Sequence, residues 1–179
     1  CRYNGRGMGL RAGLYVLGRP SSPTPAEFLE AMYGLQSAGC FAANNSWGVT
    51  PSGYDLYCQY ADAAADSGLT IVCAAGNNGA AGPVMSPAAA KNVFSVGAVT
   101  YVPDSVGIGY VTGYSSRGPT QGAARLSPWI LAPGGSFTAD SMARGVVTTN
   151  ARLDGEWLDD PNDRWPEEDS YTRRAGTSM

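Results

Sequence analysis

The sequence ends on a serine hydroxyl in a turn of small residues, Gly176-Thr177-Ser178-Met179. A serine hydroxyl is a weak nucleophile near neutral pH, and it needs a neighbouring general base, usually an imidazole, to take its proton as it attacks a carbonyl carbon. The 179 residues contain no histidine. Either Ser178 is therefore not a nucleophile, or the base comes from residues outside this sequence.

Two further segments place polar side chains directly after short apolar runs. Asn77 lies in Ala-Ala-Gly-Asn-Asn-Gly at residues 74–79, and Ser46 lies in Asn-Asn-Ser-Trp-Gly at residues 44–48. A side-chain amide can stabilise the oxyanion that develops on a carbonyl oxygen during acyl transfer. Asn77 is therefore a candidate oxyanion donor, whereas an isolated Gly-Asn pair is more often a helix cap or a turn.

The ordered set of motifs resembles the landmarks of one enzyme family. In chain order the motifs lie at residues 44–48, 74–79, 114–119 (Tyr-Ser-Ser-Arg-Gly-Pro), 131–134 (Leu-Ala-Pro-Gly) and 176–179. Each motif by itself is typical of ordinary turns. Together, over nearly the whole chain, they resemble the subtilisin-like serine peptidases, or subtilases.

The resemblance implies a serine endopeptidase that forms an acyl-enzyme on Ser178. Asn77 and the Ser178 backbone N–H are then the oxyanion donors. A backbone segment would pair with an extended substrate peptide, and a second segment of small residues would wall the pocket for the residue before the cleaved bond, with room for a large apolar group. The implied substrate-binding residues are Ser46, Trp47 and Gly48 in the first segment, Ala74, Ala75 and Gly76 in the second, and Thr177. Trp47 either lines a more distant subsite or packs as a surface aromatic.

The resemblance also implies an incomplete domain. Subtilases order their triad as Asp, His and Ser along the chain, and residues 4–16 resemble the glycine-rich turn and strand that follow the family's histidine helix. In the family a long buried helix continues after the serine. We therefore expect residues 1–179 to be a partial subtilisin-like domain that lacks the Asp- and His-bearing front and the helices after Ser178, and to be inactive by itself.

The composition suits one globular domain, with 44% hydrophobic and 15% charged residues. A net charge of −3 offers no basic patch, so a nucleic-acid partner is not expected. No apolar run reaches the roughly 20 residues that a membrane helix needs, and no secretion signal precedes the first motif. The resemblance implies an extracellular or cell-surface parent protein that acts on peptides or proteins and has a propeptide.

No cofactor or metal is predicted in this chain, although the resemblance allows calcium in the parent protein. Cys1, Cys40, Cys58 and Cys73 show no C-x-x-C spacing, so they do not predict a metal or redox motif. Cys40 and Cys73 are expected as buried thiols, and a disulfide of Cys1 or Cys58 stays open. The acidic segment 154–169 lacks the Asp ladder of a calcium loop and predicts a solvated surface insertion.

Strand and helix patterns must position these side chains. Apolar runs predict strands at residues 13–17, 40–45 and 69–74, and apolar residues at a helical spacing predict helices at residues 25–38 and 52–68. Capping signals support both helix starts, Thr24 with Glu27 for the first and Ser52 with Asp55 for the second.

Further strands are expected at residues 93–99, 129–132 and 146–149. The predicted fold class is α/β, a three-layer, doubly wound, mostly parallel sheet with helices on both faces, subtilisin-like and incomplete. Sites in such sheets form beyond the carboxyl ends of the strands. Ser46 and Asn77 both fall there, which supports them independently of the motifs.

Three alternatives compete with a peptidase. The first is a catalytically inactive subtilisin-like binding or scaffold domain, because a fold does not fix a function. The second is another type of serine hydrolase, but Ser178 lacks the G-x-S-x-G surroundings of that class. The third is a dinucleotide loop at residues 5–9, which no strand precedes.

Overall fold

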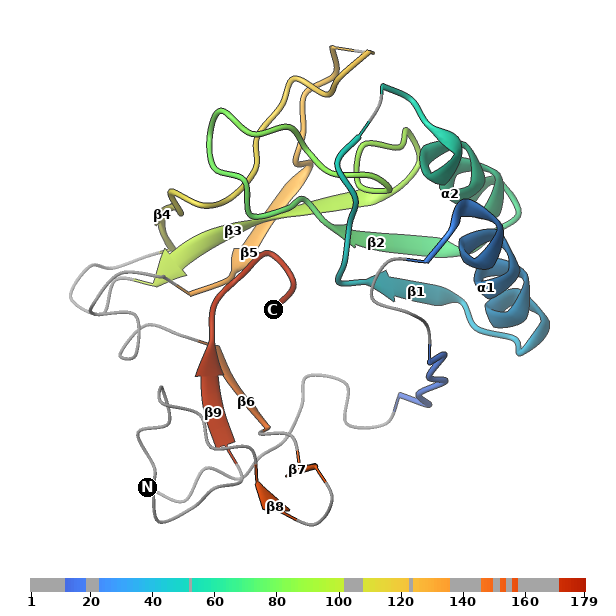
Figure 1. Cartoon of the computed structure of the whole chain (residues 1–179), viewed down its shortest axis with the longest axis horizontal. Coiled ribbons are helices and arrows are strands. Elements are labelled where there is room, and N and C mark those ends of the chain that lie inside the picture. Colours follow the sequence, from blue (N-terminus) through green and yellow to red (C-terminus); the bar gives the residue numbers. More distant parts are fainter. Residues whose placement is uncertain are drawn as a thin grey trace.

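The structure, a computed structural model, has a mixed sheet joined to helices at one side (Figure 1). It describes residues 12–18, 23–51, 53–101, 108–122, 124–135, 146–149, 152–153, 156–157 and 171–179. The elements of the sheet and its helices are α1 (Pro25–Ser37), β1 (Ala42–Asn45), α2 (Leu56–Asp66), β2 (Thr70–Ala74), β3 (Phe94–Tyr101), β4 (Ile108–Val111) and β5 (Ile130–Pro133).

The sheet is mostly parallel. β1 pairs with β2, β2 with β3, and β3 with β5 in parallel, while β4 runs antiparallel to β3. The mostly parallel α/β fold predicted from the sequence is therefore confirmed. Strands β1, β2, β3 and β5 correspond to predicted strands, whereas β4 was not predicted.

Two smaller antiparallel pairs follow β5. β6 (Val146–Thr149) pairs with β9 (Tyr171–Arg174), and β7 (Arg152–Leu153) pairs with β8 (Glu156–Trp157). The position of β6 agrees with the prediction for residues 146–149. In Figure 1, β9 points toward the C-terminus, so this strand leads the chain directly into the turn that carries the terminal serine.

The start of α1 agrees with the sequence prediction. The Thr24 hydroxyl accepts a hydrogen bond from Glu27 N (3.3 Å), and the Glu27 carboxylate accepts one from Thr24 N (2.7 Å). This reciprocal pair is the predicted capping box, and Pro25 occupies the first helical position. The cap fixes where the helix begins, and Phe28 and Met32 are then buried one turn apart.

The N-cap of α2 is Asp55, so the prediction of Ser52 was wrong. Asp55 Oδ1 accepts a hydrogen bond from Cys58 N at 3.1 Å, and Leu56 is the first helical residue. Aspartate caps a helix as well as serine does, and Asp55 stands directly before the residues with helical spacing. Within the first turn of α2, Leu56 is 47% exposed and Cys58 is buried.

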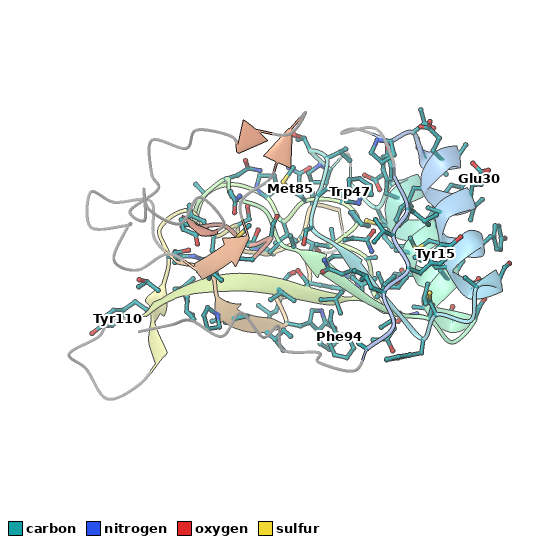
Figure 2. All side chains as sticks on the ribbon, turned by 90° about the horizontal axis from the view of Figure 1, so that it is seen from below. Tyr15, Glu30, Trp47, Met85, Phe94 and Tyr110 are labelled. Atoms are coloured by element: carbon teal, nitrogen blue, oxygen red, sulfur yellow. The ribbon has the colours of Figure 1, made fainter. Side chains whose placement is uncertain are left out.

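Both described helices contribute to one hydrophobic core. Phe28 of α1 and Ala61 of α2 share a buried cluster with Ile71 and Cys73 of β2. The two helices also lie side by side in both views (Figures 1 and 2). The described helices therefore cover the same face of the sheet.

Neither of these helices is long and apolar enough to cross a membrane.

The opposite face of the sheet carries exposed apolar side chains. Successive side chains of a strand point to opposite faces, so Phe94 and Ile130, which align with Val72 and Val96 of neighbouring strands, lie opposite the helices. Phe94 is 47% exposed and Ile130 is 48% exposed. The second helical layer expected on this face has no counterpart among the described residues.

We expect the 179-residue chain, made by itself, to bind a hydrophobic dye and to self-associate. An apolar sheet face left in water is an association site, because burying it is favourable. Dye fluorescence and sedimentation would measure both properties. A monomer with a sharp cooperative unfolding transition and no dye binding would contradict this expectation.

The predicted strand at residues 13–17 was wrong. Residues 12–18 are described and contain no strand. Leu14 and Val16 are 88% and 75% exposed, so the apolar run is not in the core. A strand needs a partner that accepts its backbone hydrogen bonds, and no described strand pairs with this run.

A buried carboxylate ties α2 to the loop before β3. Asp62 is 6% exposed, and its Oδ1 accepts hydrogen bonds from Lys91 N (2.8 Å) and Asn92 N (2.6 Å). Its Oδ2 accepts a third bond from the Tyr54 hydroxyl. Burial and the neighbouring Asp62 raise the pKa of Tyr54 to about 12, which keeps this donor protonated at neutral pH. Asp62 therefore fixes both the start of α2 and the entry to β3.

Asp62→Ala should lower the free energy of unfolding by about 3 kcal/mol, because it removes three charge-assisted hydrogen bonds and leaves their part-buried donors without this acceptor. Asp66→Ala is the matched control. Asp66 lies one turn later and accepts an exposed hydrogen bond from Asn92 Nδ2 at 2.8 Å, so its loss should cost under about 0.5 kcal/mol. Urea unfolding of the protein that contains this chain would measure both values. Equal effects would remove Asp62 from its structural role.

Candidate active site

The C-terminal turn lies at the carboxyl ends of three parallel strands, β1, β2 and β5 (Figure 1). At least one hydrogen bond joins the turn to the residues just after each strand. Three of these bonds run from Ser46 Oγ to Ser178 O (3.0 Å), from Gly76 N to Thr177 Oγ1 (3.1 Å) and from Gly176 N to Gly134 O (2.8 Å). The fold thus brings motifs that are far apart in the sequence to the edge where sites form in parallel sheets.

Gly134 has to be a glycine for the turn to approach. A Cβ at this position would lie 2.5 Å from the Ala98 Cβ and 2.7 Å from Gly176 O. Both distances are too short for a real carbon contact, and one of the atoms belongs to backbone. The Leu-Ala-Pro-Gly motif therefore supplies the site with a close backbone contact.

Ser178 and Ser46 exchange a pair of hydrogen bonds. The Ser178 hydroxyl donates to the Ser46 carbonyl oxygen at 3.0 Å, and the Ser46 hydroxyl donates to the Ser178 carbonyl oxygen at the same distance. Asn44 Nδ2 donates to Ser46 Oγ at 3.0 Å and so orients it. The Ser178 hydroxyl lies beside the backbone predicted to bind substrate, but a carbonyl oxygen is too weak a base to activate it.

Thr177 holds the Asn77 side chain in place. Thr177 N and Thr177 Oγ1 both donate to Asn77 Oδ1, at 3.0 and 3.1 Å. The same hydroxyl accepts a hydrogen bond from Gly76 N. Because these contacts occupy the amide oxygen, the amide nitrogen is left as the group that can donate to a ligand.

The two predicted oxyanion donors lie around one position. A Cβ placed on Gly176 would be 3.5 Å from Asn77 Nδ2 and 3.7 Å from Ser178 N, so both nitrogens border the same small volume. Gly176 has φ +153, a conformation that side chains rarely adopt, which favours glycine at this point of the turn. The arrangement suits the stabilisation of a negative oxygen next to the Ser178 hydroxyl.

Trp47 packs in an aromatic cluster. Its ring lies edge-on to Phe28, with centroids 5.6 Å apart, and to Tyr57, with centroids 5.8 Å apart. Such edge-to-face contacts stabilise the segment after β1 against both helices. Of the two roles considered for Trp47, the geometry supports packing, and a role in a distant subsite stays a prediction.

The segment that begins at Tyr114 supports the site through hydrogen bonds to two of its loops. The Tyr114 hydroxyl donates to Gly134 O at 2.6 Å, the carbonyl that also anchors the C-terminal turn. Desolvation raises the pKa of Tyr114, so its hydroxyl keeps its proton near neutral pH. Ser116 Oγ accepts a hydrogen bond from Asn78 N at 3.1 Å and fixes the loop after Asn77.

Met85 also belongs to this region, although its sequence context did not predict it. Met85 donates its backbone N–H to Ala75 O at 2.9 Å, and its side chain lies against Gly48 and Gly76. It therefore contacts both segments predicted to bind substrate. Nothing in the local sequence around Met85 signals this position, because it depends on the path of the loop between β2 and β3.

The two buried cysteines offer no alternative nucleophile. Cys40, Cys58 and Cys73 are free thiols, and the last two are buried. Burial raises the pKa of Cys58 to about 11 and raises the pKa of Cys73 as well. Both side chains are therefore thiols rather than thiolates near neutral pH. The expectation of a buried thiol is confirmed for Cys73, Cys40 is only half-buried, and Cys1 lies outside the described residues.

Within the described residues, no group of three or more His, Cys, Asp or Glu side chains is placed to hold a metal ion. The acidic segment at residues 154–169 lies outside the described residues except for β8. Its prediction as a surface insertion, and the calcium expected by resemblance, therefore stay predictions.

Comparison with known proteins gives a consistent result. The family model of the subtilase family, peptidase family S8, matches residues 6–179 of this chain. Among solved structures, a protein named S41 psychrophilic protease is 24% identical with a TM-score of 0.61, and the match covers 92% of this chain and 48% of that one.

Two further solved structures share the fold. A lanthipeptide protease is 21% identical with a TM-score of 0.62, over 89% of this chain and 49% of that one. Sphericase is 23% identical with a TM-score of 0.57, over 87% and 44%. The chain thus spans about half the length of these structures.

Proposed function

The chain belongs to the subtilase family, and from this premise we propose that the protein containing it is a serine endopeptidase that cleaves peptide bonds through an acyl-enzyme on Ser178. The observation that carries the proposal is the arrangement of Ser178, Asn77 and Thr177 at the carboxyl ends of parallel strands. A serine hydroxyl, a backbone N–H and an amide nitrogen held by a second residue converge there.

The reaction follows from these groups. Ser178 Oγ attacks the scissile carbonyl carbon while a general base takes its proton. The carbonyl oxygen becomes an oxyanion, which Asn77 Nδ2 and Ser178 N stabilise with two hydrogen bonds. The base then returns the proton to the leaving amine, and the peptide bond breaks to give an ester on Ser178. Water hydrolyses this ester by the same steps in reverse order.

The substrate would lie along residues 46–48 as an added strand. The Ser46 carbonyl, which accepts the Ser178 hydroxyl in this structure, belongs to the backbone that would pair with the peptide. Before it attacks, the Ser178 hydroxyl would have to donate its hydrogen bond to the base instead of to the Ser46 carbonyl. Thr177 then acts by positioning Asn77 rather than by contacting the reacting atoms.

The base must come from outside these 179 residues, which contain no histidine. In the same gene, upstream of Cys1, we expect a histidine in a His-Gly-Thr-His-like segment and, before it, an aspartate at the end of a strand. Downstream of Met179 we expect an Ala-rich apolar helix. An extracellular or cell-surface location, a propeptide and calcium binding belong to the same proposal.

A small fluorophosphonate probe tests the proposal on the full-length protein. An active serine peptidase is labelled on Ser178, and a tryptic map identifies the modified residue. Sequencing of the flanking DNA shows in parallel whether the histidine and the aspartate are encoded. A full-length gene without the histidine, or a Ser178 that resists the probe, would favour the alternative of an inactive binding or scaffold domain.

A further inference from the structure

The loop between β2 and β3 places a bulky side chain between the two segments that face the substrate. A Cβ at Gly76 would lie 2.6 Å from Met85 Cγ and 2.8 Å from Met85 Sδ. A Cβ at Gly48 would lie 2.8 Å from Met85 Cβ. The Met85 side chain is therefore sandwiched between the Cα atoms of two glycines, and each glycine leaves the space that the methionine fills.

Backbone hydrogen bonds hold Met85 in this position from both sides. Met85 N donates to Ala75 O at 2.9 Å, on the side of β2. On the other side, Ser86 and Val49 form a two-bond bridge, with N to O distances of 2.9 and 3.0 Å. Ser86 Oγ also donates to Asp55 Oδ2 at 2.6 Å. These bonds fix the backbone at Met85. Its side chain lies between the two segments predicted to bind substrate, residues 46–48 and 74–76, which are called the two walls below.

This space adjoins the reacting atoms. The wall at residues 74–76 continues into Asn77. The wall at residues 46–48 begins at Ser46, which is hydrogen-bonded to Ser178. A substrate residue whose carbonyl lies between Ser178 and Asn77 would direct its side chain between the same walls. Met85 is half-buried, whereas its neighbours Val84 and Ser86 are fully buried.

We propose that Met85 closes the pocket for the residue before the cleaved bond, so that the protein cleaves after small uncharged residues such as glycine, alanine and serine. This inference rests on the proposed function. It replaces the expectation of room for a large apolar group, which considered the small residues of the wall but not the side chain between them. An apolar methionine also disfavours a charged substrate side chain, which it cannot pair.

The test uses the full-length protein and two peptides that differ only in alanine or phenylalanine before the cleaved bond. The unaltered protein should cleave the alanine peptide with a kcat/KM at least about tenfold higher, since a pocket that lacks volume rejects added carbons by this order. Met85→Ala should raise kcat/KM for the phenylalanine peptide at least about tenfold. Met85→Leu, which keeps the bulk and removes the sulfur, should keep the preference for alanine.

The ratio of the two substrates is read within each variant, so a partly folded preparation does not change it. Labelling of Ser178 by a small fluorophosphonate, which does not enter the pocket, confirms that each variant is competent. An unaltered protein that prefers phenylalanine overturns the inference and shows that the flexible methionine moves aside. A ratio that Met85→Ala leaves unchanged overturns it as well, because another group then limits the pocket. Failure of the unaltered protein to react with both the peptides and the probe overturns the proposed function, and this inference with it.

Discussion

Replacing Ser178 by alanine in the full-length protein is expected to lower kcat for peptide hydrolysis by about 10⁶-fold. The magnitude is borrowed from the equivalent serine of a subtilisin, a member of the same family. It is large because the substitution removes the atom that forms the acyl-enzyme and leaves only the oxyanion donors and binding. Single-turnover cleavage of a fluorogenic peptide measures the effect. Ser67→Ala, at an exposed hydroxyl that bonds Ala63 O after α2, is the matched control and should leave kcat unchanged.

The 179-residue chain, made by itself, should be about as slow as the Ser178→Ala protein. Residues of a triad act as a unit, so the loss of the base costs nearly as much as the loss of the nucleophile. In this chain the Ser178 hydroxyl donates to the Ser46 carbonyl, which cannot take its proton away. Robust cleavage by the isolated chain that disappears on Ser178→Ala would show that the base lies within these residues.

The sequence predicted the elements that carry the site because their local signals agree with their surroundings. Thr24 and Glu27 form a capping box through contacts three residues apart, which can be read from the sequence. The runs that became β1 and β2 are buried on the helix side, and Ser46 and Asn77 follow them within three residues. The placement of Ser46 and Asn77 at one sheet edge followed from the parallel topology.

The predictions that were wrong concern structure that depends on residues far away in the sequence or on a choice between neighbours. Residues 13–17 have the composition of a buried strand, but Leu14 and Val16 are exposed, because an apolar run becomes a strand only when another strand pairs with it. Asp55 competed with Ser52 for the same cap, and sequence spacing alone does not rank two good capping residues.

The packing inside the site could not be predicted from the sequence either, because it depends on contacts between segments that lie far apart along the chain. The resemblance to subtilases implied a pocket wall of Ala74, Ala75 and Gly76, and their small side chains indicated a large pocket. Met85 occupies it because the loop after β2 folds back and pairs with both walls. The roles of Thr177 on Asn77 and of Tyr114 on Gly134 also required coordinates, since each joins motifs that lie far apart along the chain.

Asn77→Ala in the full-length protein should lower kcat by about 10² to 10³-fold and leave KM nearly unchanged. The donor is needed for the oxyanion, which forms only after substrate is bound, so its loss raises the barrier without weakening the ground state. The size is the one known for the equivalent subtilisin asparagine and is borrowed from it. Steady-state kinetics on one peptide separates kcat from KM.

Truncation of Asn77 also removes the acceptor of two hydrogen bonds from Thr177, so a fall in kcat could come from a loosened turn. Asn77→Asp separates the two causes. The aspartate keeps an oxygen for Thr177 N and Thr177 Oγ1 but replaces the amide nitrogen by a second oxygen, which cannot donate. If donation to the oxyanion is the role of Asn77, this variant should lose at least as much kcat as Asn77→Ala, while its thermal unfolding midpoint stays near that of the unaltered protein.

Asn78→Ala is the matched control for both variants. Asn78 is the next residue of the same loop and is tied to Ser116 Oγ through its backbone N–H, which the substitution keeps. Its kcat should therefore stay within about twofold of the unaltered value, as expected for an exposed side chain away from the reacting atoms. If Asn77→Asp keeps the unaltered kcat, the oxyanion role moves from Asn77 to the backbone donor of Ser178, and the contacts of Thr177 become purely structural.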